Sequence, residues 1–353
     1  MDRYIGVDVH TQTCTFAVMG PTGRRLREQV VETNGKVLVE FIKGIAGTKH
    51  VCLEEGTHSE WLYELFKPQV QEIVVVQPRE SAGQKNDSID AWALAEQIRQ
   101  GRISRPVFKA PGIYSELRAA VRAHQALVSD SVRAKNRLKA IYRSRGLSGL
   151  GTEVYKPDQR ETWLKKLPSH RRKLAEILSN ELDVVTEVRE SAEQWLQEEA
   201  ARCAIVKLLA TAPGIGTTRA AQIVAIVVCP TRFRTRQQFW SYCGLGIVTR
   251  SSSDWVRDRD GTWVRRETAQ TRGLNRNRQP TLKAVFKGAA LNVIQSSPKQ
   301  PLHQDYQRMI SAGKNPSLAR LTIARKIAAA VLAMWKTKEE YDPAKSQPKP
   351  HAA

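Results

Sequence analysis

Four carboxylates in the first third of the chain have the types and the spacing of a metal site. Asp8 lies in a strand-like stretch, YIGVDVH, and Glu54 ends a second one, HVCLE. Asp87 and Asp90 are three residues apart at the start of a helical pattern, so their side chains share one face of that helix. Converging carboxylates repel one another unless a cation neutralises them, and hard oxygen ligands suit Mg²⁺ or Mn²⁺. Paired ions of this kind stabilise the attacking and leaving oxygens of a phosphodiester, so the pattern points to phosphodiester chemistry.

An α/β domain would have to position these four carboxylates. Residues 4–31 alternate apolar and polar side chains as three strands would, with a turn signal, PTG, between the second and the third. Helical patterns then alternate with two further apolar strands, up to a helix that ends at Gly101. This order predicts a mixed sheet within residues 1–108, with the strand carboxylates and the helical pair meeting at one edge of the sheet. Taken singly, Asp87 could instead cap its helix, and Glu54 could be a charge at a strand end.

The charge balance of the chain indicates a polyanionic partner. Its 353 residues include 56 Lys and Arg against 35 Asp and Glu, a net charge of +21. Basic side chains that neutralise phosphates release condensed counterions, so this excess favours nucleic acid over the small substrates of a metabolic enzyme. The sequence shows no signal peptide, lipidation motif or apolar run of about 18 residues, so we expect a cytoplasmic, nucleoid-associated protein without membrane contact. Five widely spaced cysteines argue against a disulfide framework or a structural zinc site.

The middle of the chain, residues 109–204, has the pattern of two long helices. Residues 114–145 contain no Gly or Pro and carry eight basic and two acidic side chains, and a second helical stretch at 160–200 is interrupted near Pro168. Together they predict a helical hairpin or coiled-coil stalk. A basic helix face can simply be solvated, but the one-sided charge of the first helix favours phosphate contacts. The residues predicted to make these contacts are Arg133, Lys135, Arg137 and Lys139.

A tight Gly-Ile-Gly turn, with Gly214 and Gly216, lies near the start of the region 205–341. The turn separates two helical segments and resembles a helix–hairpin–helix, in which backbone N–H groups hold a DNA phosphate without reading its sequence. Thr217 or Thr218 is expected to cap the second helix. A plain packing corner between two helices is the alternative, and the basic surroundings favour the nucleic-acid interpretation.

Residues 232–288 combine arginine with aromatic side chains. They hold 13 Arg or Lys against four acidic residues, interleaved with Phe233, Phe239, Trp240, Trp255 and Trp263. This mixture is typical of backbone clamping with base stacking, although Phe239 and Trp240 lie on an apolar helix face that also explains them. The residues of this region predicted to contact nucleic acid are Arg250, Arg265, Arg266, Arg272, Arg276 and Arg278. An amphipathic helix at 316–336 and a polar tail at 342–353 follow.

The ordered set of motifs resembles the DEDD transposases of bacterial insertion sequences, which are related to the pilin-gene invertases and include bridge-RNA-guided recombinases. IGVD, CLEEGT and KNDSIDAWALAE stand in the places of the four acidic motifs. APGIG, FWSYCGLG, a serine, a basic stretch and ARKIAAAVLAMWK stand in the places of the C-terminal motifs. The likeness covers residues 4–343. It implies an RNase H-like, RuvC-like domain at 1–108 and an α-helical transposase domain with a helix–hairpin–helix-like motif at 205–341.

The resemblance implies that the four carboxylates named above hold the catalytic metal ions. Glu55 competes with Glu54, because the family's glutamate is usually followed by one or two small residues and then glycine. Strand alternation through HVCLE favours Glu54.

The family also uses a serine nucleophile in its C-terminal domain. The stretch TRSSSDW holds three consecutive serines, and a serine run on its own is usually a polar surface turn. Counted from the Gly-Leu pair at 244–245, Ser252 matches the nucleophile. Ser253 stands where the family has glycine, so Ser251 and Ser253 stay as alternatives. The family's Gly-Asn-Arg and Leu-Arg are spread out here as RGLNRNRQPTLK, which leaves open which arginine contacts which backbone.

The mechanism implied by the family is transesterification. The serine attacks a DNA phosphodiester, forms a phosphoserine and releases a 3′-hydroxyl, with Mg²⁺ or Mn²⁺ assisting. In the family the site forms between protomers of a homodimer or homotetramer, and the helical stalk is where we expect the protomers to meet. The implied partners are donor and target DNA and a structured non-coding guide RNA, called a bridge RNA.

Two other functions account for part of the sequence. A RuvC-like metal-dependent nuclease or junction resolvase, with an inert serine, explains the four carboxylates but not the C-terminal region. A non-enzymatic nucleic-acid-binding protein explains the charge but leaves the carboxylates without a role.

Overall fold

The structure is a computed structural model that describes residues 1–78, 86–103, 112, 114–249, 255–265 and 271–343. The chain divides into two compact units, an N-terminal unit, Met1–Ile113, and a C-terminal unit, Tyr114–Ala353. Among the described residues, no helix is both long and apolar enough to span a membrane.

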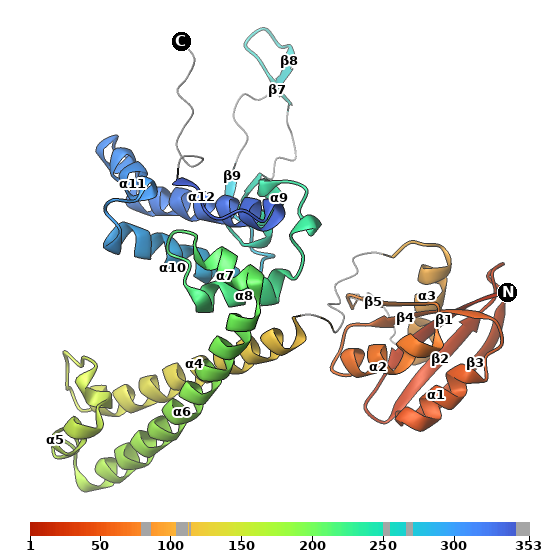
Figure 1. Cartoon of the computed structure of the whole chain (residues 1–353), viewed down its shortest axis with the longest axis horizontal. Coiled ribbons are helices and arrows are strands. Elements are labelled where there is room, and N and C mark those ends of the chain that lie inside the picture. The colour runs from red at the N-terminus through yellow and green to blue at the C-terminus, as the bar shows by residue number, and fades with distance from the viewer. Residues whose placement is uncertain (79–85, 104–111, 113, 250–254, 266–270, 344–353) are drawn as a thin grey trace. The chain divides into compact units, whose positions relative to one another are not determined.

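The N-terminal unit is a five-stranded mixed sheet with helices on both faces (Figure 1). The strand order is β3-β2-β1-β4-β5; β1–β2 and β2–β3 are antiparallel, whereas β1–β4 and β4–β5 are parallel. The elements are β1 (Asp2–Val9), β2 (Thr13–Met19), β3 (Arg25–Glu32), α1 (Gly35–Lys43), β4 (Thr48–Glu54), α2 (Ser59–Phe66), a 3₁₀ turn (Lys67–Gln69), β5 (Glu72–Val76) and α3 (Asp87–Arg99). The predicted α/β domain with a mixed sheet is confirmed, and its arrangement is consistent with an RNase H-like domain.

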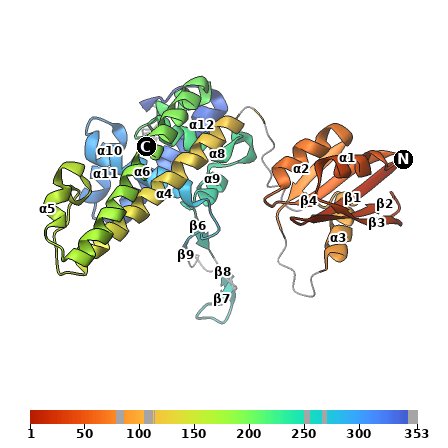
Figure 2. The ribbon, with the colours of Figure 1, turned by 90° about the horizontal axis from the view of Figure 1, so that it is seen from below.

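The alternation of side chains along β1 and β4 decides which residues meet which helix. Val7 and Leu53 are fully buried with the apolar residues of α1 and α2, whereas Cys52 packs with Leu94 and Ile98 of α3 on the opposite face. Figure 2 shows α1 and α2 on one side of the sheet and α3 on the other. Residues at even positions of these two strands therefore face α3.

Gly6 allows α3 to lie directly on the backbone of β1. A Cβ atom at this position would lie 1.9 Å from the carbonyl oxygen of Ala91 and 2.5 Å from the amide nitrogen of Ala95, both in α3. Because these neighbours are backbone atoms, the helix itself would have to move. Gly6 thus fixes how closely the middle of α3 approaches β1, two residues before Asp8.

We expect Gly6→Ala to lower the free energy of unfolding by about 2–3 kcal/mol, the cost of overpacking a tight contact. The metal-dependent DNA cutting that the family resemblance implies should fall at least tenfold, because a shift of α3 separates Asp87 from Asp8. Thermal unfolding and a cleavage assay measure the two effects. Gly20→Ala, directly after β2, is the matched control, because a Cβ atom there meets no atom closer than 3.6 Å. Equal behaviour of the two variants would contradict this role of Gly6.

A long helical hairpin opens the C-terminal unit (Figure 1). Its arms are α4 (Ser115–Arg143) and α6 (Ser169–Arg202), and α4 is uninterrupted, as the absence of Gly and Pro predicted. Leu138 and Tyr142 of α4 pack with Leu182 of α6 in one buried cluster. Two 3₁₀ turns (Glu153–Tyr155 and Pro157–Gln159) and α5 (Arg160–Leu164) connect the arms.

The remaining elements form a mainly helical body around a second core. Phe239, Phe286 and Trp335 are buried there. The elements are α7 (Ala204–Ala210), α8 (Thr217–Val227), a 3₁₀ turn (Pro230–Arg232), α9 (Arg236–Tyr242), β6 (Ile247–Thr249), β7 (Trp255–Arg257), β8 (Trp263–Arg265), β9 (Thr271–Leu274), α10 (Pro280–Ser296), α11 (Pro301–Ser311) and α12 (Pro316–Thr337). The helical character was predicted, but the four short strands were not, because three or four residues are too few to show a strand's alternation.

Candidate active site

Asp8, His10 and Asp87 come together at the edge of the N-terminal sheet. Nε2 of His10 lies 3.0 Å from Oδ2 of Asp8 and 3.4 Å from Oδ1 of Asp87, and one ligand atom from each residue lies within 4.8 Å of the others. The Asp8 side chain is 18% exposed, whereas His10 and Asp87 are more than half exposed. Asp8 is therefore largely buried in the sheet, whereas His10 and Asp87 face solvent on the side from which a substrate can approach.

The start of α3 brings Asp87 to this group without using it as the helix cap. Asn86 is the N-cap, and its side chain accepts a hydrogen bond of 3.0 Å from the backbone N–H of Ser88. Asp87 and Asp90 then occupy the first turn of the helix. The alternative role of Asp87, that of the helix cap, is thus wrong, because Asn86 fills it.

Electrostatics at the site favour a bound cation. Burial raises the pKa of the Asp8 carboxyl above its ordinary value, and the charges of Asp87 and Asp90 raise it further, although His10 acts in the opposite direction. Ionised Asp8 is therefore disfavoured by the fold itself. A divalent cation would remove this penalty, and the carboxylate oxygens of the site are ligands that Mg²⁺ or Mn²⁺ accepts.

Glu54 lies one strand away from Asp8 and faces the same side of the sheet. The parallel register pairs Val7 with Leu53, and Asp8 and Glu54 are the next residues along their strands. Alternation from Cys52 places Glu54 on the α3 side. Glu55 follows the strand, and its backbone N–H donates to the carbonyl oxygen of Val76. Glu54 and Asp90 lie outside the group of three that could share one ion as the side chains stand.

His10 was missed from the sequence. The signal was present, because Asp8 and His10 are two residues apart and the end of a strand presents alternate residues on one side. A histidine at a strand end is common without a ligand role, and only the position of Asp87 gives this one its significance.

The three candidate serines, Ser251 to Ser253, lie outside the described residues, as do Arg250 and Arg266. The structure does describe where their segment leaves and returns. β6 and β9 pair antiparallel, with Ile247 opposite Leu274 and Thr249 opposite Thr271. In the sequence, Ser252 is three residues beyond β6.

Asn275 forms hydrogen bonds between the end of β9 and the residues before β6. Its backbone N–H donates to the carbonyl oxygen of Gly246 at 3.0 Å, and its side-chain amide donates to Oγ of Ser241 at 2.9 Å. These bonds tie the end of β9 to α9 and to the glycine-containing loop before β6.

Two arginines lie against the same loop. The side chain of Arg278 packs on Gly244, and Nε of Arg325 donates to the carbonyl oxygen of Leu245 at 2.8 Å. Within the described part of the chain, neither forms an ion pair, and each keeps one buried guanidinium nitrogen, Nε of Arg278 and Nη2 of Arg325, without a hydrogen-bond partner. Burial also lowers the pKa of Arg325. Arg278 was predicted to contact nucleic acid, whereas Arg325, in the closing ARK motif, was missed.

The two glycines of the Gly-Ile-Gly turn have different surroundings. Gly214 has φ +70°, and a Cβ atom there would lie 2.4 Å from the carbonyl oxygen of Ala289 in α10, so its glycine is required by the packing. Gly216 is the N-cap of α8 and has open space around it, and no side chain caps the helix. The expected threonine cap is therefore wrong, since the hydroxyl of Thr218 contacts Gln197 of α6 instead.

The four basic residues predicted on α4 already have partners within the chain. Arg133 pairs with Asp130, and Arg137 pairs with Glu181 of α6. The ammonium groups of Lys135 and Lys139 lie 5.5 and 5.1 Å from the ring centre of Tyr155, and Lys139 also donates to the carbonyl oxygen of Leu150. The lysines thus hold the connection between the arms of the hairpin, which gives them a structural explanation.

The other predicted arginines lie along the β6–β9 region. Arg265 ends β8, Arg272 lies in β9, and Arg276 is an exposed residue just after β9.

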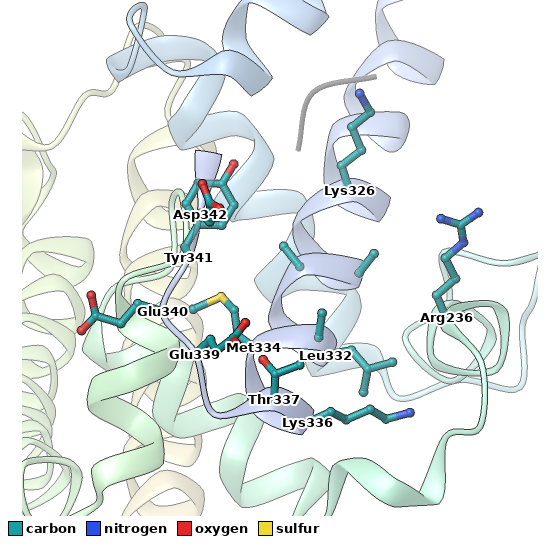
Figure 3. A pocket seen from close by; sticks show the side chains of 13 residues that line it. Arg236, Lys326, Leu332, Met334, Lys336, Thr337, Glu339, Glu340, Tyr341 and Asp342 are labelled. Atoms are coloured by element: carbon teal, nitrogen blue, oxygen red, sulfur yellow. The ribbon is translucent and has the colours of Figure 1, made fainter. Parts of the chain in front are cut away.

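A cavity of about 720 Å³ lies beside α12. Its floor is formed by alanines, Leu332 and Met334 of α12, and Figure 3 shows Tyr341 and Asp342 on the segment that follows this helix. The charged residues around it are Arg236, Lys326, Lys336, Glu339, Glu340 and Asp342. Of the predicted catalytic residues that the structure describes, none lines this cavity, so we assign it no catalytic role.

Comparison with known proteins gives two family matches. A family model described as "Transposase", for DEDD proteins of the IS110 group, matches residues 5–144, and one described as "Transposase IS116/IS110/IS902 family" matches residues 206–307. The first range includes all four predicted carboxylates, and the second includes the serine run. A search of curated proteins finds no match. The two matches together cover more than half of the chain, which belongs to the IS110 family of transposases.

Proposed function

We propose that this transposase cuts and rejoins DNA by transesterification, with Ser252 as the nucleophile and Asp8, Glu54, Asp87 and Asp90 as the ligands of Mg²⁺ or Mn²⁺. The observation that supports it most is the meeting of Asp8, Asp87 and His10 at one edge of the sheet in a chain of this family. Metal ions held there would neutralise negative charge on the reacting phosphate. His10, hydrogen-bonded to Asp8, would orient that carboxylate.

The proposed reaction keeps the number of phosphate ester bonds constant. The Ser252 oxygen attacks the phosphorus and loses its proton, the bond from phosphorus to the 3′ oxygen breaks, and that oxygen leaves as a 3′-hydroxyl. A 3′-hydroxyl of the partner strand then attacks the phosphoserine and regenerates the serine. Each step exchanges one ester for another, so no nucleotide cofactor is needed. Arg278 and Arg325, which lie against the loop before β6, are the groups we propose to neutralise the phosphate during the exchange.

Labelled DNA incubated with the protein and Mg²⁺, then denatured, tests this function. Label that stays on the protein supports the phosphoserine. Cleavage without protein-bound label would indicate a RuvC-like nuclease, and neither product would indicate a non-enzymatic binding protein.

We also propose a structured guide RNA as a partner, in addition to donor and target DNA. The net charge of +21 supports a second polyanion but does not separate RNA from DNA. The same labelling reaction, run with protein stripped of co-purified RNA, tests whether RNA is needed for cutting at a specific site.

The stalk offers a surface for a second protomer. On α6, Leu174, Ile177, Val184 and Val188 follow the 3–7–4 spacing of a heptad seam and are 40–59% exposed. The opposite face of the helix is already buried against α4. We propose that two stalks pair along this seam, so that Ser252 of one protomer acts with the carboxylates of the other.

Val184→Asp with Val188→Asp should therefore weaken the dimer about 100-fold or more, because four valines per dimer lose their burial. Light scattering at micromolar protein concentration measures the molar mass of the protein in solution and so shows whether it is a dimer. The control is Val30→Asp on β3, because Val30 is 59% exposed, as Val184 is. A monomeric wild-type protein, or an unchanged mass of the double variant, would contradict the seam.

A further inference from the structure

β7 and β8 form an antiparallel hairpin that carries two tryptophans on one face. The register sets Trp255 opposite Arg265 and Arg257 opposite Trp263. Side chains two apart along a strand, and directly opposite residues of an antiparallel pair, point to the same side. Both indoles therefore belong to one face of the hairpin, and Arg257 is on that face next to each of them, opposite Trp263 and two residues from Trp255.

This face is exposed. Trp255 is 55% exposed and Trp263 is 59% exposed, whereas Trp92 and Trp335 are almost fully buried. The guanidinium carbon of Arg257 lies 5.3 Å from the ring centre of Trp263, within the range of a cation–π contact. The hairpin thus presents flat aromatic surface together with positive charge.

Hydrogen bonds at the tip hold the two strands in this arrangement. The backbone N–H of Asp258 donates to the carbonyl oxygen of Thr262 at 2.8 Å, and that of Gly261 donates to the carbonyl oxygen of Asp258 at 2.9 Å. Gly261 has φ +80°, which a glycine adopts without strain. The strands that carry the indoles are therefore joined by a hydrogen-bonded turn. Because the backbone is already ordered, binding a ligand costs little conformational entropy there.

We propose that this face stacks unpaired bases of the DNA strand that Ser252 attacks. The inference rests on the proposed function, because Trp255 is only three residues after Ser252 in the sequence. An indole stacks on any base, and arginine adds contacts to the strand's phosphates, so binding would depend on exposed bases rather than on sequence. Bases in a duplex are covered by their neighbours and cannot stack in this way. The proximity to the serine selects DNA as the ligand over RNA.

The test measures binding without catalysis. Trp255→Ala and Trp263→Ala are introduced singly and together into the Ser252→Ala protein, in buffer with EDTA. The probes are a single-stranded DNA, an abasic strand of equal length, the corresponding duplex and a single-stranded RNA of the same sequence. Each tryptophan removed should weaken binding of the single-stranded DNA about tenfold, and the double variant about 100-fold. Binding of the abasic strand and of the duplex should not change.

Two controls separate stacking from a general loss of structure. Trp255→Phe with Trp263→Phe should keep most of the affinity, because phenylalanine still stacks. Trp61→Ala, at a tryptophan of α2 that is 38% exposed, should bind like the parent protein. Single-stranded DNA should also quench tryptophan fluorescence in the parent and far less in the double alanine variant.

An equal loss on the abasic strand or the duplex, a loss confined to RNA, or no loss would each overturn the proposal. Failure of the proposed function is seen separately, as the absence of a protein–DNA adduct in the wild-type protein. The base-dependent loss of binding is measured in a protein that lacks Ser252 and does not depend on that outcome.

Discussion

Asp8→Asn should abolish metal-dependent DNA cutting and, at the same time, stabilise the metal-free protein. The expected loss of rate is about 1,000-fold or more, because charge stabilisation by a bound metal contributes several kcal/mol to such reactions. The gain in stability follows from the raised pKa of Asp8. A carboxyl whose pKa is higher in the folded than in the unfolded protein opposes folding once it is ionised. Asparagine keeps the shape and a hydrogen-bond acceptor for His10 but removes the charge that burial, Asp87 and Asp90 disfavour.

The sign of this stability change depends on pH. Above the raised pKa of Asp8 the wild-type protein carries the penalty, so the metal-free variant should melt at a higher temperature at pH 7. As the pH falls through that pKa the wild-type carboxyl takes up a proton, and the difference should shrink. Thermal melts at several pH values, with EDTA or with Mg²⁺, measure both effects.

Metal should reverse the order of stability. Mg²⁺ should raise the melting temperature of the wild-type protein, because it binds the folded state, and should have little effect on the variant. Asp2→Asn, at the other end of β1, is the control and should behave like wild type in both assays. Full activity of Asp8→Asn, or an unchanged response to Mg²⁺, would remove Asp8 from the metal site.

The sequence predicted which elements carry the four carboxylates, because that depends on local periodicity. Strand alternation placed Asp8 and Glu54, and the three-residue spacing of Asp87 and Asp90 placed them on one helix face. The contact between Gly6 and α3 could not be predicted, because it joins residues about 85 positions apart, and the position of His10 beside Asp87 depends on that contact.

Charge alone does not show which of the basic residues contact nucleic acid. The basic residues of α4 looked like a phosphate-contacting face, yet Lys135 and Lys139 lie against Tyr155 and Arg137 pairs with Glu181. A count of charges cannot show which cations the fold already uses. Short strands were missed for a similar reason, since β6 pairs with β9 across more than twenty residues and only that pairing defines them.

Ser252→Ala should eliminate the covalent protein–DNA adduct. Alanine removes only the attacking oxygen, so the fold and the response of the melting temperature to Mg²⁺ should stay as in wild type. Loss of a nucleophile that no neighbour replaces lowers the rate about 1,000-fold or more. Ser251→Ala and Ser253→Ala are the matched controls and should still form the adduct. If one of them loses it while Ser252→Ala does not, the nucleophile is that serine instead.

Mixing the two inactive variants tests whether the site is shared between protomers. In a mixed dimer, the Asp8→Asn chain supplies an intact Ser252 and the Ser252→Ala chain supplies intact carboxylates. If each site combines the serine of one protomer with the metal of the other, one site per mixed dimer is complete. Adduct formation should then return in about half of the dimers, as expected for random exchange of equal amounts. The label must appear only on the Asp8→Asn chain, which a size tag on one chain reveals. If both residues act within one chain, no mixture restores the adduct, because every chain lacks either the oxygen that attacks or the carboxylate that holds the metal.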